Sequence, residues 1–501
     1  MFASILGITV MCVHANDRPL ANPVQPANPV HPVQWIRDGR AFACDKLLSA
    51  ARRTDVAPGI VLAALDPSRA DYRYEWTRDG ALFTAGLTHT YRLTHDEGFR
   101  SEIRDWMGKR ITTLLKTQTA GSVSEPKINP DGTIFTGGWS RPQNDGPALR
   151  ASAFIAWYLT RALEGADPHE LTRLYEKKVP AGSLIKRDLE FTAHQWRNPS
   201  YDIWEEVLGD HFFTRLAQWT SLQLGGYLAS RTSDFGAADF YLRQASLIRT
   251  SLGDFWDSRL ERIVATRGRT AGADDKHSGL DAAVLLAVLY CDRIMTPELG
   301  GGACAVSLDD ERVLSTYAQL AQSFEKAYPR IQGSHGTQHG RGLWWGRYPE
   351  DRYDGDTNNS RGNPWILTTL AAGEYLSRLR TRFLSAKAVA ITTVNLKFYQ
   401  WLLDRTQDPQ IIDLHPGQNI KAGSPLFASV IDSLQREALA QGSRVADFVR
   451  DHQGTWPGSL PEQVDRDRLL PRGPNDLLWS YLGFYQFDDS FDNREASELK
   501  K

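Results

Sequence analysis

Residues 201–206, YDIWEE, place two adjacent carboxylates directly behind an indole. A carboxyl beside an apolar ring and a second carboxyl is penalised in its charged form, so the pKa of one of the two rises. A carboxyl that holds its proton in this way can act as a general acid. Glu205 and Glu206 therefore predict acid catalysis, although a bare glutamate pair can also be a solvated helix start.

Four further segments combine aromatic side chains, arginines and carboxylates. Arginine offers a rigid fork of donors and aspartate a pair of acceptors, so an Arg–Asp couple can hold neighbouring hydroxyls of a sugar while an indole stacks on its apolar face. Arg78 and Asp79 form such a couple, although they could equally be a structural ion pair. The four segments are YRYEWTRD at 72–79, GGWSRPQNDGP at 137–147, GRYPED at 346–351, and LPEQ at 460–463 followed by LWSY at 478–481.

The composition favours a neutral substrate over nucleic acid or an anionic membrane. The chain has 501 residues, 41% of them hydrophobic, and a formal net charge of −2. It can bury a large core, and it has no block of lysine and arginine to bind a polyanion. Its 15 Trp, 17 Tyr and 20 Phe supply flat faces for sugar rings, although most are expected in the core. The signatures of P-loop, zinc-protease and serine-hydrolase sites are missing.

The N-terminal segment has features of an export signal. Residues 2–13 form an apolar run too short to span a bilayer, and VHA at 13–15 resembles a cleavage site, although no lysine or arginine precedes the run. We therefore predict a signal peptide over residues 1–15, a secreted or periplasmic location, and a Pro-rich extended linker over residues 16–35.

Cleavage there would leave three cysteines, Cys44, Cys291 and Cys304. Their spacing fits no metal site, and an odd number does not make a disulfide framework. Cys291 and Cys304 could close a small loop through the glycines at 300–302, a question that the sequence alone leaves open.

The remainder is predicted to be one all-α domain over residues 36–490, followed by a short polar tail over 491–501. Apolar residues recur at spacings of three and four, as at Phe213, Leu216 and Trp219, whereas period-two alternation is scarce. About a dozen such helices, with chemistry-bearing connectors between them, predict a double ring with a pocket at one end. The expected helices cover residues 41–53, 79–93, 100–119, 147–163, 184–196, 212–230, 237–252, 280–291, 309–328, 364–379, 386–403, 425–439 and 476–485.

Six strings in order resemble the glucoamylases, family fifteen of the glycoside hydrolases, over residues 40–488. The strings are DYRYEWTRD, GGWSRPQNDGPALRA, YDIWEEV, GRYPEDRY, GNPW, and PEQ followed by LLWSY. The resemblance implies an (α/α)6 barrel of about twelve helices with long functional loops at one end, in agreement with the helical pattern.

The resemblance also implies the roles of individual residues. Glu205 matches the general acid and Glu462 the general base. An inverting hydrolase holds two such carboxyls roughly 6.5–9.5 Å apart, which leaves room for a water molecule. The residues matched to substrate binding are Tyr72, Arg78, Asp79, Trp139, Arg141, Glu206, Arg347, Asp351, Tyr353 and Trp479.

The implied activity is exo-acting, inverting release of β-D-glucose from non-reducing ends of α-1,4-glucans (starch, glycogen and maltooligosaccharides), with slower attack on α-1,6 links. The expected partners are α-glucan oligosaccharides and polysaccharides, not nucleic acid or a membrane, and the expected state is a monomer without metal or organic cofactor. A protonated Glu205 working with an ionised Glu462 would give a bell-shaped pH profile with an acidic optimum.

Two alternatives remain open from the sequence. The first keeps the fold and the acid–base pair but acts on isomalto-oligosaccharides, dextran or trehalose. It gains ground from two departures from the family strings, namely Phe135 in place of a common Tyr and Ser140 in place of a common Gly; Pro461 before the base is a third, unusual departure. The second is a non-catalytic glucan-binding protein, which would have lost the acid or the base.

Overall fold

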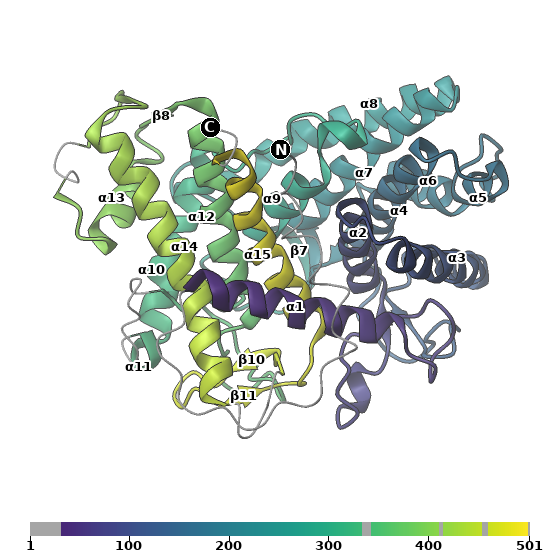
Figure 1. The fold of residues 1–501 in the computed structure, drawn as a ribbon, viewed down its shortest axis with the longest axis horizontal. Helices are drawn as coiled ribbons and strands as arrows, with labels where there is room; N and C mark the ends of the chain where they lie inside the picture. Colours follow the sequence, from purple (N-terminus) through teal and green to yellow (C-terminus); the bar gives the residue numbers. More distant parts are fainter. Residues whose placement is uncertain (1–31, 333–341, 410–413, 453–458, 499–501) are drawn as a thin grey trace, which may run out of the picture.

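The computed structural model describes residues 32–332, 342–409, 414–452 and 459–498. The predicted signal peptide, and residues 16–31 of the predicted linker, lie outside the described residues. Twelve of the described helices form two concentric rings (Figure 1). The inner ring consists of α2 (Thr77–Leu93), α4 (Asp145–Leu163), α7 (Phe212–Arg231), α9 (Ala283–Ile294), α12 (Ile366–Ala386) and α15 (Leu478–Glu498). The outer ring consists of α1 (Pro32–Ala51), α3 (Glu97–Ala120), α6 (Leu184–Gln195), α8 (Phe235–Leu252), α10 (Glu311–Ala327) and α14 (Pro425–Asp451).

The chain alternates between the rings, and each inner helix contacts the next until α15 returns to α2. Inner helices are buried on nearly every side, as in the uninterrupted buried run AVLLAVLYC of α9. Outer helices bury one stripe only; in α10 the buried stripe includes Val313, Tyr317, Leu320 and Phe324. A helix that is apolar all round belongs in a core, and one with a single apolar stripe belongs at a surface. The predicted (α/α)6 barrel is therefore confirmed.

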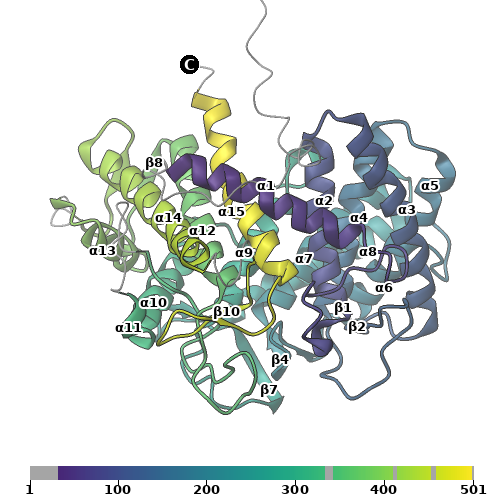
Figure 2. The same cartoon turned by 60° about the horizontal axis from the view of Figure 1, so that its bottom comes forward.

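Several of the short strands, β1, β2, β4, β7 and β10, lie at one end of the rings, whereas β8 lies away from them (Figure 2). The pairs are antiparallel: β1 (Glu75–Trp76) with β2 (Lys127–Ile128), β3 (Ser200–Tyr201) with β4 (Val207–His211) and β4 with β7 (Thr266–Gly272), β5 (Trp256–Asp257) with β6 (Arg262–Ile263), β8 (Ala388–Ala390) with β9 (Asn419–Lys421), and β10 (Gln463–Val464) with β11 (Pro471–Arg472). Period-two alternation did not predict strands this short.

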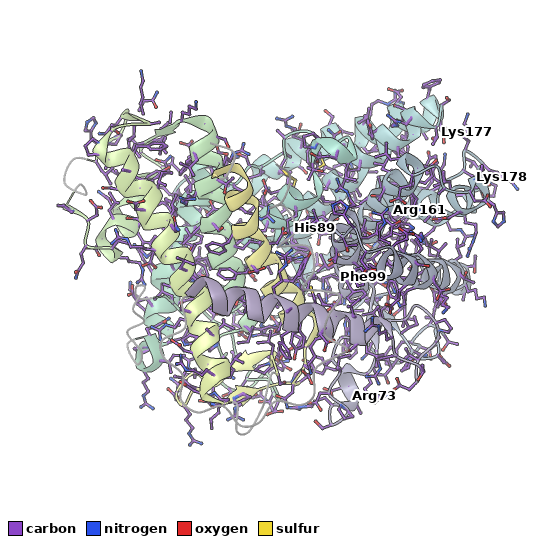
Figure 3. All side chains as sticks on the ribbon, in the orientation of Figure 1. Arg73, His89, Phe99, Arg161, Lys177 and Lys178 are labelled. Atoms are coloured by element: carbon purple, nitrogen blue, oxygen red, sulfur yellow. A yellow bond between two sulfur atoms is a disulfide. The ribbon has the colours of Figure 1, made fainter. Side chains whose placement is uncertain are left out.

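Each sequence cluster predicted to carry chemistry lies in the segment that leads into an inner helix or in the first turn of that helix. Residues 72–76 precede α2, 137–144 precede α4, 201–206 lie in the hairpin before α7, 346–351 precede α12, and 460–463 precede α15. Figure 3 shows the two ends of α2, with Arg73 before its first residue and His89 near its last. The N-terminal ends of the inner helices, which carry partial positive charge, therefore surround the end where these clusters meet.

Buried polar contacts fix the segment before α2. Glu75 accepts two hydrogen bonds from the Arg110 guanidinium of α3, at 2.9 and 3.1 Å, and one from the Val61 amide at 2.8 Å. At the other end of α2, His89 contacts Asp489 of α15 at 3.2 Å. Buried charges are retained only when they are paired and hydrogen-bonded. The contacts of Glu75 with Arg110 and Val61 therefore hold the β1 backbone, and hence Trp76, in one position.

The structure corrects several predicted boundaries. Helix α1 begins at Pro32, inside the predicted linker, because a first helical turn tolerates proline. The predicted helix over 386–403 is instead the end of α12, strand β8 and helix α13 (Leu396–Arg405), since Lys387 ends α12 with a left-handed φ of 55° and a β-branched run follows. Helix α15 continues to Glu498, into the predicted polar tail.

Two short helices, α5 (Pro168–Leu174) and α11 (Pro329–Gln332), were not predicted.

Cys291 and Cys304 form a disulfide, which answers the question that the sequence left open. Among the described residues, no helix combines the length and apolar character needed to cross a membrane.

Candidate active site

The clusters that the sequence singled out meet around one cavity of about 480 Å³. This volume lies in the usual range of small-molecule sites. Ten of the twelve predicted site residues line it: Tyr72, Arg78, Asp79, Trp139, Glu205, Glu206, Arg347, Tyr353, Glu462 and Trp479.

A tight turn between β3 and β4 presents Glu205 and Glu206. The Glu205 amide donates to the Asp202 carbonyl at 3.0 Å, and the Asp202 carboxylate accepts from the amides of Glu206 and Val207 at 2.7 and 3.0 Å. Gly272 of β7 lies so close that a Cβ there would be 2.0 Å from the Glu206 carbonyl oxygen. Glu205 itself has a left-handed φ of 66°, a conformation that surrounding structure must impose on a glutamate. The turn therefore fixes the direction of the Glu205 side chain.

Among the described residues, every hydrogen bond to the Glu205 carboxylate goes to one of its two oxygens, Oε1. Oε1 accepts from Trp76 Nε1 at 2.6 Å, Trp139 Nε1 at 2.9 Å and Gln143 Nε2 at 2.7 Å, and Arg78 Nη2 lies 4.0 Å away. Among the described residues, no donor contacts Oε2, which leaves this oxygen to carry a proton. The raised pKa expected from the Trp–Glu–Glu sequence stays a prediction.

Glu462 is the second carboxylate of the cavity, and its side chain is 3% exposed. Tyr72 donates to Oε1 at 2.8 Å and Gln463 to Oε2 at 3.0 Å. Burial raises the pKa of Glu462 to about 7, against the opposing effect of the Tyr72 hydrogen bond. Gly473 packs on this side chain, and a Cβ at its position would lie 2.6 Å from Oε2. Glu462 therefore becomes ionised at a higher pH than an ordinary glutamate.

A single aromatic segment holds both carboxylates. Tyr72 donates to Glu462 and Trp76 donates to Glu205, and the ring centroids of the two aromatics are 6.1 Å apart. Glu205 and Glu462 are far apart in the sequence and reach the cavity from different connectors. This arrangement allows one to act on each side of a bound ring.

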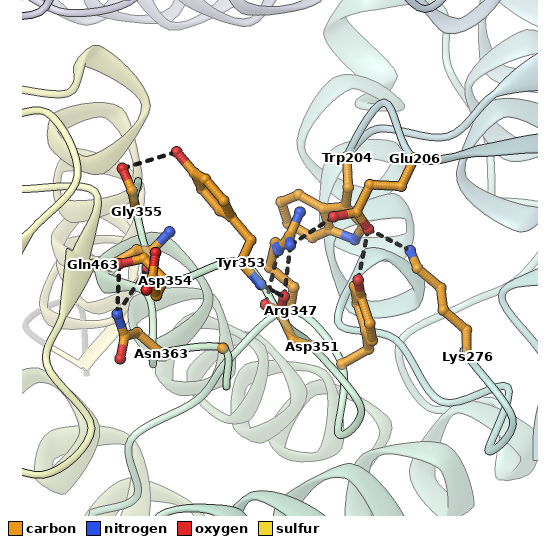
Figure 4. A network of polar contacts seen from close by, with 12 residues as sticks. Trp204, Glu206, Lys276, Arg347, Asp351, Tyr353, Asp354, Gly355, Asn363 and Gln463 are labelled. Carbon is orange, nitrogen blue, oxygen red and sulfur yellow. Dashed lines mark hydrogen bonds and ion pairs between the residues drawn. The ribbon is translucent and has the colours of Figure 1, made fainter. Parts of the chain in front are cut away.

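Glu206 joins a charged network behind the cavity (Figure 4). Its carboxylate accepts from Arg347 Nη2 and from the Tyr348 hydroxyl, each at 2.7 Å, and Lys276 Nζ lies 3.3 Å away. Lys276 also pairs with Asp202 at 2.8 Å, so one ammonium ties Glu206 to the residue that shapes its turn. Glu206 is thus fixed at the cavity, with its charge compensated by Arg347 and Lys276.

The Arg–Asp couple at 78–79 lies at the bottom of the cavity. Arg78, 5% exposed, donates to Asp145 at 3.3 Å and to the Gln143 side-chain oxygen at 3.1 Å, and its guanidinium lies 5.8 Å from the Trp479 ring centroid. Burial raises the pKa of Asp79 to about 6, with Arg78 opposing the rise. The ring of Trp204 stacks with that of Trp479, their centroids 6.5 Å apart, and adds an apolar surface beside this Arg–Asp couple.

Two predicted substrate-binding residues do not line the cavity. Asp351 accepts two hydrogen bonds from Arg347, at 2.8 and 2.6 Å, and so orients that guanidinium. Arg141 is held by Glu125 at 2.7 and 2.8 Å and donates to nearby carbonyl groups. In this structure both residues act by holding neighbouring groups of the site, and their direct contact with substrate stays a prediction.

Sequence reasoning missed other residues of the site. Trp76 and Gln143 stood inside the quoted strings, but only the fold shows that they donate to Glu205. Lys276 lies in a segment without aromatic residues and had no signal. Asn358, from the loop over residues 354–362, also lines the cavity and was not among the predicted site residues.

The same loop carries acidic residues that are already engaged. Asp354 accepts from the amides of Asp356 and Thr357 at 3.1 and 2.8 Å, and Asp356 pairs with Arg69 at 2.6 Å. Over the described parts of the chain, no group of three or more His, Cys, Asp or Glu is arranged to hold a metal ion.

Comparisons with known proteins agree with this geometry. Residues 43–486 match the family described as "Glycosyl hydrolases family 15". A "Glucoamylase" of Blastobotrys adeninivorans is 33% identical over 440 residues, which cover 85% of this chain and 66% of that protein. A "Probable glucoamylase" of Schizosaccharomyces pombe is 30% identical over 460 residues, 89% of each chain. The solved structure "Glucoamylase from Saccharomycopsis fibuligera at atomic resolution" superposes with a TM-score of 0.77 at 26% identity, covering 94% of this chain and 97% of that one.

Proposed function

Because the chain belongs to glycosyl hydrolase family 15, we propose that it is an exo-acting, inverting glucan 1,4-α-glucosidase. Its substrates would be the non-reducing ends of α-1,4-glucans, namely starch, glycogen and maltooligosaccharides, with slower attack on α-1,6 links. The observation that carries the proposal is the pair of carboxylates, Glu205 and Glu462, that share one cavity and are held by the two aromatics of one segment.

The proposed chemistry is a single displacement. Glu205 transfers the proton on Oε2 to the glycosidic oxygen as the bond from that oxygen to the anomeric carbon breaks. Glu462 takes a proton from a water molecule, whose oxygen bonds to the anomeric carbon from the opposite face. The three donors on Oε1 stabilise the Glu205 carboxylate that remains, because hydrogen bonds to the charged form favour it. The product is glucose of inverted, β configuration.

The inner end of the cavity supports the proposal of exo-action. Trp479 lines both the main cavity and a void of only about 20 Å³ below it, within the barrel. Leu82, Phe213, Leu286 and Leu367 fill the surroundings of that void. A polymer is therefore not expected to thread through the barrel, which favours a substrate that enters the cavity by its chain end.

The departures from the family strings do not favour another sugar. Phe135 packs 5.2 Å from the ring centroid of Tyr74 and is not among the cavity-lining residues. Ser140 does line the cavity, but its hydroxyl donates to the Glu205 carbonyl at 2.7 Å. Incubation with maltose, maltoheptaose, isomaltose and trehalose tests the proposal: glucose should form fastest from the first two. Faster release from isomaltose or trehalose would favour the alternative substrates.

Location and assembly are further parts of the proposal. A secreted or periplasmic location is supported by the apolar run at residues 2–13 and by the disulfide between Cys291 and Cys304, since disulfides persist mainly in oxidising compartments. A monomer is sufficient, because one chain supplies both carboxylates and the cavity around them.

The pH dependence of activity should reflect the burial of Glu462. As a base it must be ionised, and because burial raises its pKa to about 7, activity is expected to fall as pH drops through that value. Loss of the Glu205 proton would produce the alkaline limb of a bell-shaped kcat/KM profile. Initial rates on maltose at low substrate concentration give this profile.

The Tyr72→Phe variant tests whether Glu462 produces the acidic limb of the pH profile. Removing the hydroxyl takes away a hydrogen bond that favours the charged form of Glu462, so the acidic limb should move to higher pH. An acidic limb that moves to lower pH in this variant, or a parent rate still rising through about pH 8, would contradict the roles given to the two glutamates.

A further inference from the structure

Lys127 is a buried ammonium group surrounded by aromatic rings. The residue belongs to β2 and is 2% exposed. Its Nζ lies 3.6 Å from the ring centroid of Trp139, 4.1 Å from that of Tyr74, 4.6 Å from that of Trp76 and 4.8 Å from that of Phe135. We call these four rings the aromatic cage. Within the described residues, no carboxylate lies within ion-pair distance of this nitrogen.

A buried charge without an ion pair is costly unless another interaction compensates it. Ring faces provide that compensation, since their negative quadrupole attracts a cation, most strongly when the cation is desolvated. Burial lowers the pKa of Lys127 to about 8, so the side chain remains charged at acidic and neutral pH. A cage that retains a charge at this cost suggests a use for that charge.

Two rings of the cage are the indoles that hold the general acid. Trp76 and Trp139 both donate to Glu205 Oε1, at 2.6 and 2.9 Å. A cation on the face of an indole draws electron density from the ring, which makes its N–H a stronger hydrogen-bond donor. The Lys127 ammonium also places a positive charge on the other side of the rings from Glu205. This charge favours the carboxylate form of Glu205.

We propose that Lys127 is a positioning residue for the general acid: its ammonium holds Trp76 and Trp139 as donors to Glu205 and strengthens Glu205 as an acid. The inference rests on the proposed role of Glu205. When the proton leaves for the glycosidic oxygen, the indole hydrogen bonds and the charge of Lys127 stabilise the carboxylate left behind. Lys127 acts through the rings and does not line the cavity.

Other charged groups face this region, from every element packed against it. They are Asp71 of the 3-10 helix η1 (Ala70–Tyr72), Arg78 and Asp79 of α2, Arg141 of the following connector with its partner Glu125, Asp145 of α4, and Glu206 of the same turn. All of these remain in the variants below, so a change in pH dependence can be assigned to position 127.

The test compares pH profiles of kcat/KM on maltose for three variants. Lys127→Met keeps the approximate volume but removes the charge, so the Glu205 pKa should rise and the alkaline limb should move up by about one pH unit, with kcat several-fold lower. Lys127→Arg keeps the charge, and its alkaline limb should stay within about 0.3 unit of the parent. Lys109→Met is the matched control, because Lys109 is exposed and pairs only with Asp105 on α3.

The limb positions do not depend on how much of a variant is folded, so a loss of stability cannot imitate the shift. An alkaline limb that stays in place in Lys127→Met would overturn the inference. So would an equal shift in Lys127→Arg, since packing rather than charge would then be responsible. A parent enzyme that releases no glucose from α-glucans would overturn the proposed function, and the inference with it, before any variant is compared.

Discussion

Glu205→Gln is expected to lower kcat on maltose by about 10³-fold while KM changes little. Glutamine has nearly the same shape but no transferable proton, so substrate binds as before and the glycosidic oxygen leaves unprotonated. The backbone turn that presents residue 205 rests on Asp202 and should be unaffected. Steady-state kinetics on maltose, with thermal unfolding as a check of the fold, measure the effect.

A substrate with a better leaving group distinguishes loss of the acid from general damage. Fluoride departs without needing a full proton, so α-glucosyl fluoride should remain a good substrate of Glu205→Gln. A variant equally impaired on maltose and on the fluoride would mean that the cavity is disrupted. Maltose activity within about threefold of the parent would show that Glu205 is not the acid.

Glu462→Ala is the second change with a large expected effect, a loss of about 10²–10⁴-fold in kcat on maltose and on α-glucosyl fluoride alike. Without the carboxylate, no group on that side of the ring removes a proton from the attacking water. Protonation of the leaving group does not replace this step, which is why the fluoride should not restore the rate. The contrast between the two substrates separates the roles of Glu205 and Glu462.

Azide tests the position of the base. It is a strong nucleophile that carries no proton to remove, and the truncated side chain leaves space beside Tyr72 and Gln463 for it. With α-glucosyl fluoride, Glu462→Ala should regain activity and form β-glucosyl azide. Formation of the α-azide would place attack on the other face of the ring and contradict the assignment. Glu462→Gln, which fills the same space, should be rescued less and serves as the control.

The sequence predicts the double ring because burial patterns of helices are local. Inner helices such as α9 are apolar on all sides, and outer helices such as α10 have one apolar stripe, so each helix carries its own signal. Boundaries are less certain, since they depend on single residues. Lys387, with its left-handed φ, ends α12 where the apolar pattern alone continues.

The catalytic pair was predicted from strings of residue types, but its environment depends on contacts far apart in the chain. Nothing near Glu462 in sequence indicates that Tyr72 donates to it, and nothing near Glu205 indicates Trp76 or the Lys127 behind it. Nor does the sequence indicate that Arg347 donates to both oxygens of Asp351, whose binding role stays a prediction.

The anomer that is released first tests the account most directly. Proton NMR, recorded within seconds to minutes of adding the protein to maltoheptaose, separates α- from β-glucose before the two interconvert. If Glu205 protonates the glycosidic oxygen while Glu462 activates water on the opposite face, β-glucose must appear first and the α-anomer only later by mutarotation. α-Glucose as the first product would mean two displacements through a covalent sugar, and it would contradict the single displacement proposed for these carboxylates.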